Sequence, residues 1–298
     1  MYERLSNCPL CSSEQFQNKV ICNDFLVSNE SFVIVKCDNC TFEFTNPRPK
    51  DEFIGDFYQS DSYISHSNKI SSITDIAYRV ARFFALKRKV RLVNSYHSTS
   101  RILDYGCGTG AFLAACKKSG WKIAGVELDP KTRDLACNLT DSPIHENLDT
   151  IEEKDNFEII TLWHVLEHVT DINSVISQLR QKLTKTGKLI IAVPNVDSLD
   201  NEIYKEHWAA YDVPRHLYHF DQSTMKAMMK KHQFKLIDIK PMKLDAYYVS
   251  LLSEQYLQSN NKGSGNKYLK SIINGYKSNS YAKNNNNNYS SLIYVLEK

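Results

Sequence analysis

The chain has 298 residues, of which 42% are hydrophobic and 24% charged, a balance typical of a globular protein with a sizeable core. A formal net charge of +3 is too small to indicate nucleic-acid binding from charge alone. The first residues, MYERLSNCPLC, lack the apolar run of a signal peptide, and no stretch approaches the roughly 18 apolar residues that span a bilayer. We therefore expect a cytoplasmic protein without a membrane span.

Four of the eight cysteines form two Cys-x-x-Cys pairs, Cys8 with Cys11 and Cys37 with Cys40. In the absence of an export signal, pairs with this spacing are more typical of metal ligands than of disulfides. Four thiolates suit a closed, tetrahedral and therefore structural Zn²⁺ site. The segment SFVIVKCDNCTFEFTN predicts a hairpin whose turn carries the second pair. The pattern predicts a zinc ribbon over residues 1–48.

Residues 49–98 are expected to form a helical connector. Apolar residues recur at spacings of three and four from Ile70 to Phe84, which predicts an amphipathic helix. Its other face carries a basic run: Arg79, Arg82, Lys87, Arg88, Lys89 and Arg91. A solvated face is the simpler interpretation. A basic wall facing an acidic substrate, such as a nucleotide-linked sugar, is the alternative.

Strands and helices alternate from Arg101 onward. The predicted strands are RILDYG, KIAGVEL, SPIHEN, FEIITLWH and GKLIIAVPN, and the predicted helices between them are AFLAACKKS, PKTRDLACNL and DINSVISQLRQKL. This alternation predicts an α/β fold with a parallel sheet covered on both faces. Two later strands, FKLIDIKPMKL and SSLIYVLEK, are separated by a polar stretch that includes Asn284 to Asn288. We expect that stretch to be a mobile surface loop.

The segment LDYGCGTGAF places Gly106, Gly108 and Gly110 at a predicted strand-to-helix turn, where the backbone must bend sharply and approach a ligand closely. The pattern also fits a dinucleotide site. However, Asp104 would be repelled by a pyrophosphate and attracted by the ammonium and sulfonium groups of S-adenosylmethionine. Glu127 ends the next strand, where an acid can accept hydrogen bonds from both ribose hydroxyls. A cationic nucleoside ligand is therefore predicted.

The motifs LDYGCGTG, GVELDP, HENLD, FEIITLWHVLEHV and GKLIIAVPN, in this order, resemble those of class I S-adenosylmethionine-dependent methyltransferases. The resemblance covers residues 99–298 and implies a Rossmann-like, seven-stranded sheet with the last strand antiparallel. It also implies that Asp104 and the three glycines surround the methionine moiety and that Glu127 binds the ribose. Leu148, in HENLDT, either flanks the adenine or is an ordinary core leucine.

The cysteine pairs, the NPRP segment and WHVLEHV together resemble bacterial methyltransferases associated with sugar and surface-polysaccharide biosynthesis. This implies O- or C-methylation of a small-molecule acceptor, a sugar or a surface-glycan or lipid precursor. Deoxysugar C-methyltransferases carry a further C-terminal domain, for which we expect no room here. An RNA methyltransferase is an alternative because zinc ribbons can bind nucleic acid, although the modest charge argues against it. A non-catalytic scaffold is disfavoured by the glycine loop.

The segment WHVLEH places His164, Glu167 and His168 at the end of the fourth strand, and YDVPRHLYHF adds His216. A helical turn there would put the first three on one face. One interpretation is a divalent-metal site of Glu167, His168 and His216, with or without His164. It resembles the Glu-x-x-Glu-His pattern of small-RNA 3′-end and quinone O-methyltransferases, with a histidine in place of the first glutamate. The others are a histidine general base or simple packing. The three histidines are our candidate catalytic residues.

Overall fold

The computed structural model describes residues 1–58, 73–152 and 156–298, with side chains in helix α3 described from residue 83 onward. The expected connector helix is present as α3, Ile73–Tyr96. Ile70 lies outside the described residues, as do the side chains of Arg79 and Arg82. Before α3, the segment after the N-terminal sheet forms α1, Asp51–Ile54, and the 3₁₀ helix η1, Gly55–Tyr58.

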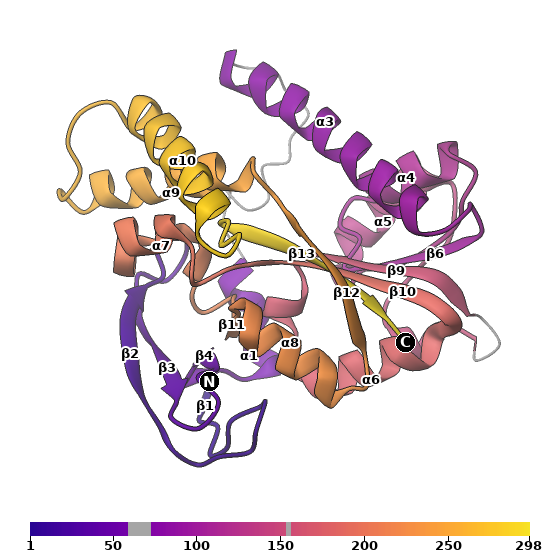
Figure 1. Ribbon diagram of the computed structural model, residues 1–298, viewed down its shortest axis with the longest axis horizontal. Coiled ribbons are helices and arrows are strands. Elements are labelled where there is room, and N and C mark those ends of the chain that lie inside the picture. The colour runs from indigo at the N-terminus through magenta and orange to yellow at the C-terminus, as the bar shows by residue number, and fades with distance from the viewer. Residues whose placement is uncertain (59–72, 153–155) are drawn as a thin grey trace.

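Seven strands of the described residues form the central sheet, in the order β12-β13-β10-β9-β6-β7-β8 (Figure 1). In chain order these strands are β6 (Arg101–Tyr105), β7 (Lys122–Val126), β8 (Ile144–His145), β9 (Phe157–Trp163), β10 (Leu183–Pro194), β12 (Lys235–Pro241) and β13 (Ser291–Glu297). Strand β13 is antiparallel to both of its neighbours, and the other six run parallel to one another. The predicted sheet with an antiparallel last strand is confirmed.

Helices cover both faces of this sheet, which explains the continuous apolar runs in its central strands. Successive residues point to opposite faces, so Ile159 and Ile190 pack in one core, whereas Ile160 and Leu189 pack in the other. The first core is completed by α3 and α4, and the second by α6 and α8. The helices that follow α3 and precede β12 are α4 (Ala111–Lys118), α5 (Pro130–Thr140), α6 (Ile172–Lys182), α7 (Leu199–Tyr204) and α8 (Gln222–Lys231).

Local signals in the sequence set where several of these helices begin. Asp129 caps α5 by accepting a hydrogen bond from the Thr132 amide at 2.7 Å, with Pro130 at the first helical position. Asp171 caps α6 in the same way. Asp221 forms a reciprocal capping box at the start of α8. No helix among the described residues is long and apolar enough to cross a membrane.

The polar stretch between β12 and β13 is not the loop that we expected. It forms two packed helices, α9 (Asp245–Ser259) and α10 (Lys267–Asn284), and of the asparagine run only residues 285–288 lie outside them. The expectation rested on polarity, but a helix can bury small residues. Ser271, Gly275 and Ser278 form part of the buried face of α10. Composition alone was therefore misleading here.

The N-terminal segment forms a second sheet, of order β11-β4-β3-β2. Its strands are β2 (Phe16–Asn23), β3 (Ser31–Cys37), β4 (Glu43–Thr45) and, from much later in the chain, β11 (Tyr218–His219). The predicted hairpin is confirmed as β3 and β4. A short pair, β1 (Tyr2–Glu3) and β5 (Arg48–Pro49), lies beside it. The segment shares a sheet with the rest of the chain because β11 pairs with β4, and it shares a core because Phe42 stacks on Tyr218.

Arg215 joins the N-terminal segment to the loop that precedes β11. Its guanidinium is buried and pairs with Asp24 at 2.9 Å and with Asp212 at 2.8 Å, and it also donates to the Phe57 carbonyl. Burial disfavours the charged form of Asp24, but the hydrogen bond from Arg215 holds the pKa of that carboxyl below its usual value. The buried charges therefore depend on one another.

We expect Arg215→Ala to lower the free energy of unfolding by about 3–5 kcal/mol, because it leaves buried carboxylates without a cation. Urea unfolding followed by circular dichroism measures the change. The control is Lys240→Ala, which removes a pair with Asp238 whose side chains are 40% and 37% exposed, and it should cost less than about 1 kcal/mol. A loss for Arg215→Ala as small as that of the control would contradict the expectation.

Candidate active site

The glycine loop adopts a backbone that requires glycine. The φ angles of Gly106, Gly108 and Gly110 are 72°, 53° and 77°, in the left-handed region that other residues rarely adopt. A Cβ on Gly106 would come within 2.6 Å of Val165, and one on Gly110 within 3.1 Å of Ala136. The loop is thus held against the segment after β9 on one side and against α5 on the other.

Gly108 lies between these two contacts and has open space in front of it. No described heavy atom lies within 4 Å of where its Cβ would be. Its amide donates to Glu127 Oε2 at 2.9 Å, and the Asp129 amide donates to Glu127 Oε1. The structure therefore brings together the loop and the acid that the sequence placed about twenty residues apart.

Asp104 is buried beneath the loop on β6. The Thr161 hydroxyl donates a 2.6 Å hydrogen bond to it, and burial raises the pKa of its carboxyl to about 7. A nearby bound cation would stabilise the ionised form. Leu148 is also buried, in the 3₁₀ helix η2 (Leu148–Thr150) after β8, where it packs in the core.

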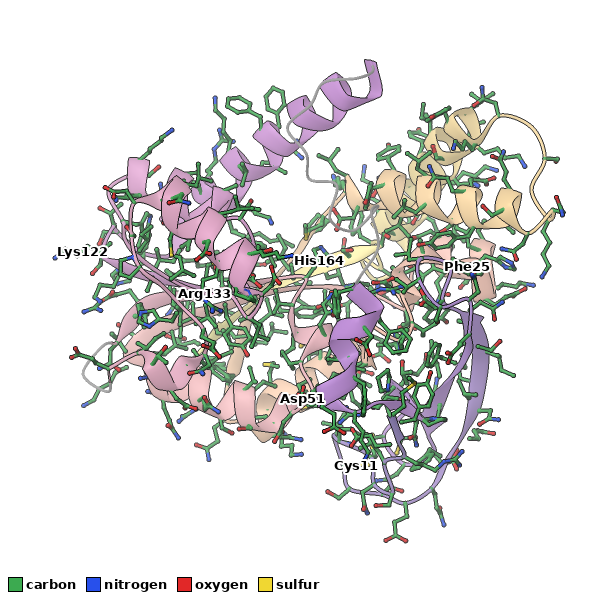
Figure 2. All side chains as sticks on the ribbon, turned by 180° about the vertical axis from the view of Figure 1, so that it is seen from behind. Cys11, Phe25, Asp51, Lys122, Arg133 and His164 are labelled. Carbon is green, nitrogen blue, oxygen red and sulfur yellow. The ribbon has the colours of Figure 1, made fainter. Side chains whose placement is uncertain are left out.

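His164 follows β9 with a φ of 57° and does not belong to a helical turn. Its Nδ1 lies 3.3 Å from Glu167 Oε1, and its Nε2 lies 3.0 Å from Asp245 Oδ2 at the start of α9. Burial disfavours the imidazolium, but the hydrogen bonds to Asp245 and Glu167 raise the pKa of His164 to about 9. His164 is therefore protonated at neutral pH, and Figure 2 shows it near the middle of the molecule.

Glu167, His168 and His216 come together, with ligand atoms within 4.8 Å of one another. The first two belong to the 3₁₀ helix η3, Leu166–His168, and the third to the loop before β11. The His168 and His216 rings meet edge to face with centroids 4.4 Å apart. His164 is not in this group, so the shared helical face predicted for it and its neighbours is not formed.

The donor atoms of this group suit a divalent cation. His168 Nδ1 lies 3.1 Å from the Arg215 carbonyl, and His216 Nδ1 lies 2.8 Å from the Ala210 carbonyl. Because a carbonyl only accepts, His216 Nδ1 carries a proton and its Nε2 keeps a lone pair for a ligand. His168 Nδ1 also lies 2.9 Å from the Tyr58 hydroxyl, which can donate or accept, so the tautomer of His168 depends on that hydroxyl as well as on the carbonyl. Among the described residues, the buried Glu167 Oε2 has no hydrogen-bond partner. Burial, together with His216, lowers the pKa of His168 to about 4, so this ring is neutral.

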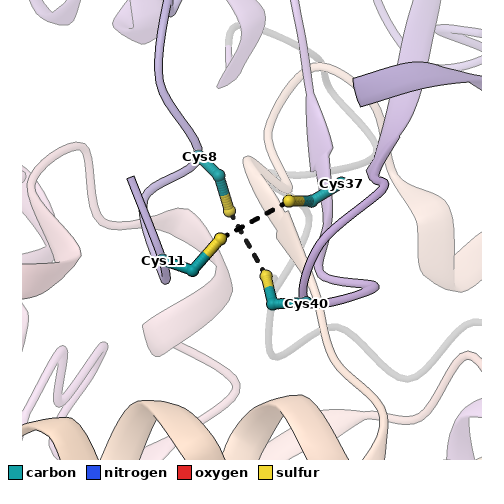
Figure 3. Close-up of side chains that lie close together, drawn as sticks. All are labelled: Cys8, Cys11, Cys37 and Cys40. Carbon is teal, nitrogen blue, oxygen red and sulfur yellow. Dashed lines mark hydrogen bonds between the residues drawn. The ribbon is translucent and has the colours of Figure 1, made fainter. Parts of the chain in front are cut away.

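The four N-terminal cysteines form a second candidate metal site. The Cys8 and Cys40 sulfurs are 3.6 Å apart, those of Cys11 and Cys37 are 3.5 Å apart, and all four lie within 4.8 Å (Figure 3). All four thiols are free. A tetrahedral zinc with bonds of about 2.3 Å separates its sulfur ligands by about 3.8 Å, so the group fits this ion.

Each cysteine pair is held by the same turn. The Ser12 amide donates to the Cys8 carbonyl at 2.9 Å, and the Thr41 amide donates to the Cys37 carbonyl at 3.0 Å. Ser12 and Thr41 have φ angles of 62° and 63°. Cys11 lies in a turn before β2, and Figure 2 shows it in a different part of the molecule from His164, so this group is separate from the histidine group.

Residues 74–239 match the family model described as a methyltransferase domain. The chain belongs to this methyltransferase domain family. It is 25% identical over 146 residues to a ubiquinone biosynthesis O-methyltransferase of Rhodopseudomonas palustris (strain TIE-1), which is 46% of this chain and 57% of that protein. It is 31% identical over 103 residues to the enzyme of that name from Bradyrhizobium sp. (strain ORS 278), which is 32% and 40% of the two chains. The chain thus spans 57% of the length of the first relative and 40% of the second.

The fold of this methyltransferase domain is also similar to a solved structure. Magnesium protoporphyrin IX methyltransferase from Synechocystis PCC 6803 with bound SAH superposes with a TM-score of 0.54 at 12% sequence identity, covering 84% of this chain and all of that one. At this identity the similarity establishes the fold alone. The predicted class I methyltransferase fold is confirmed by it and by the strand order.

Three residues near these groups were missed by the sequence analysis. Thr161 donates to Asp104, Asp245 pairs with His164, and the Tyr58 hydroxyl lies 2.9 Å from His168 Nδ1. Thr161 lies within a predicted strand, where nothing distinguishes it from a core residue. The other two are far in sequence from their partners, so no local pattern identifies them.

We expect purified protein to contain about one zinc per chain and Cys37→Ser to lose it, because a structural zinc site needs all four ligands. Metal analysis of protein prepared without chelator measures the content. The matched control is Cys137→Ser, which changes a free cysteine outside the group and should keep the zinc. A folded wild-type protein without zinc would contradict the assignment.

Proposed function

We propose that this methyltransferase domain transfers a methyl group from S-adenosylmethionine to an oxygen of a small-molecule acceptor. The observation that carries the proposal is that two groups lie side by side. One is the open glycine loop beside Glu127, and the other is the group of Glu167, His168 and His216. Val165 connects the two, because it contacts Gly106 and immediately precedes η3. A donor site and an acceptor site thus share one edge of the sheet.

S-adenosylmethionine supplies an electrophilic methyl group on its sulfonium. Asp104 and the loop of Gly106, Gly108 and Gly110 hold the methionine moiety, and Glu127 accepts from the ribose hydroxyls. Leu148 is buried in the core, and its place beside the adenine rests on the resemblance alone. The open space at Gly108 supports this assignment, since a ligand can approach the backbone closely there. The hydrogen bond from the Gly108 amide to Glu127 holds the carboxylate beside that space.

At the acceptor edge, Glu167, His168 and His216 would hold a divalent cation, which supplies Lewis-acid polarisation of an acceptor oxygen. The carbonyl groups of Arg215 and Ala210, together with the Tyr58 hydroxyl at His168, orient the two imidazoles. In the absence of the cation, the neutral His168 can instead act as the base that accepts the acceptor's proton, whereas the protonated His164 is suited to donating a hydrogen bond. The pKa values therefore favour His168 over His164 as a base.

A sugar or a surface-glycan or lipid precursor is the acceptor class that we propose, on the resemblance of the N-terminal pattern and WHVLEHV. A second candidate is a quinone-type phenol. It is favoured by the carboxylate and two imidazoles of Glu167, His168 and His216 and by the two similar proteins named ubiquinone biosynthesis O-methyltransferase. Both classes present a hydroxyl group, so the chemistry required of the chain is the same.

We expect Glu127→Ala to weaken S-adenosylmethionine binding by about tenfold to a hundredfold, because each lost hydrogen bond to a charged group costs about 1.5–3 kcal/mol. Isothermal titration calorimetry measures the dissociation constant. Glu146→Ala removes an exposed carboxylate nearby and serves as the control, with unchanged affinity. Tight binding of NAD and no binding of S-adenosylmethionine would contradict the proposal.

We expect His216→Ala to lower Mn²⁺ affinity strongly and to leave S-adenosylmethionine affinity unchanged, because the variant removes one ligand of the cation alone. Calorimetry with Mn²⁺ needs no acceptor. The matched control, His232→Ala, removes a histidine that pairs with Ser177 and Asn173 instead.

With an acceptor in hand, His168→Ala and His216→Ala should reduce turnover at least about a hundredfold. Loss of activity in chelator, restored by magnesium or manganese, would support the cation. Activity indifferent to chelator would leave base catalysis by a histidine and reject the cation. Full turnover in both variants would show that the histidines are structural.

A further inference from the structure

Helix α10 turns its large apolar side chains toward solvent. Five residues at spacings of one, three and four form a single stripe along the helix, and they are between 42% and 66% exposed: Tyr268, Leu269, Ile272, Ile273 and Tyr276. We call this set the α10 stripe. A helix on the surface of a globular protein ordinarily does the reverse and buries such a stripe in the core.

The orientation of α10 is fixed by its opposite, buried face of small residues. A Cβ on Gly275 would come within 2.6 Å of the Tyr247 ring of α9. The Ser278 hydroxyl donates to the buried Asp200 of α7 at 2.7 Å. Larger residues would not fit between these helices, so α10 cannot rotate its stripe inward without breaking these contacts.

The segment that carries the stripe has charge of a single sign, and two of its lysines, Lys262 and Lys270, pair with Glu206 and Glu254 outside it. From Gln255 to Ser290 the chain contains no aspartate or glutamate, and its five charged residues are all lysines: Lys262, Lys267, Lys270, Lys277 and Lys283. Lys277 and Lys283 are exposed on α10 itself. An exposed apolar stripe accompanied by lysines is the pattern of helices that lie in the interface of anionic membranes.

We propose that α10 docks this protein on an anionic lipid membrane, with the α10 stripe among the outer acyl chains and the lysines on lipid phosphates. A second copy of the chain fits less well, because pairing two stripes would bring two lysine-rich faces together. The helix pair also leads to the candidate site, since Asp245 at the start of α9 pairs with His164. Docking goes beyond the proposed methyl transfer and can be measured without an acceptor.

The test is co-sedimentation of the full-length protein with vesicles of phosphatidylcholine alone or mixed with phosphatidylglycerol. We expect binding to the anionic vesicles, weakened by salt, and little binding to phosphatidylcholine alone. The double variant Leu269→Ser, Ile272→Ser should lower the partition coefficient at least about tenfold, because each side chain no longer buries apolar surface. The matched control is Leu135→Ser, Leu139→Ser on α5, at 57% and 54% exposure against 59% for both stripe residues, and it should bind like wild type.

A charge variant, Lys277→Glu with Lys283→Glu, tests the same surface without touching the stripe and should also lose binding. Circular dichroism and S-adenosylmethionine titration show whether each variant is folded, so a failure of docking is distinct from a failure of the proposed function. Docking is rejected if the wild-type protein ignores anionic vesicles, or if both variants bind them as well as wild type does. It is also rejected if light scattering finds a dimer that the stripe variant alone dissociates.

Discussion

The arrangement of the N-terminal sheet and the histidine group depends on the ion pairs that the buried Arg215 guanidinium forms with Asp24 and Asp212. A charge this deep in a protein is tolerated only when it is paired and fully hydrogen-bonded. Its partners come from both sides: Asp24 from the N-terminal segment and Asp212 from the loop before β11. The backbone carbonyl of the same residue lies 3.1 Å from His168 Nδ1. The N-terminal segment therefore helps to position the candidate ligand His168, and the two cannot shift independently.

The segment that follows β9 also connects two parts of the molecule. It contacts the glycine loop through Val165 and carries Glu167 of the candidate metal group. Val165 fills the space that a side chain on Gly106 would need, so the loop and the segment after β9 are in direct contact. Two residues later Glu167 is buried between the histidines. Because interiors are close-packed, a change at Val165 would alter the separation between the two proposed sites. The positive φ of His164 turns the chain into this segment.

Features with a local cause were predictable from the sequence. The glycine loop, the capped helices, the cysteine hairpin and the parallel strands each follow from a short pattern, and the order of strands follows from the resemblance. The pairing of β11 with β4, the contact of Asp245 with His164 and the packing of Tyr58 on His168 join residues far apart in the chain. No local pattern encodes such contacts. Glu167, His168 and His216 were anticipated as a group, but the raised pKa of His164 depends on Asp245 as well as on Glu167.

The mistaken prediction for α9 and α10 has a physical cause that bears on their role. Helix prediction looks for large apolar residues that face a core, whereas α10 buries serine, glycine and alanine against α9 and α7. Small residues allow close helix packing at little hydrophobic gain. The leucine and isoleucines of the α10 stripe are 42–59% exposed, so a large part of each side chain makes no contact within the chain. Polar residues at the stripe positions would preserve the packing of α10 against α9 and α7 equally well. Their presence is accounted for by something outside the chain, and the adjoining lysines restrict it to an anionic surface.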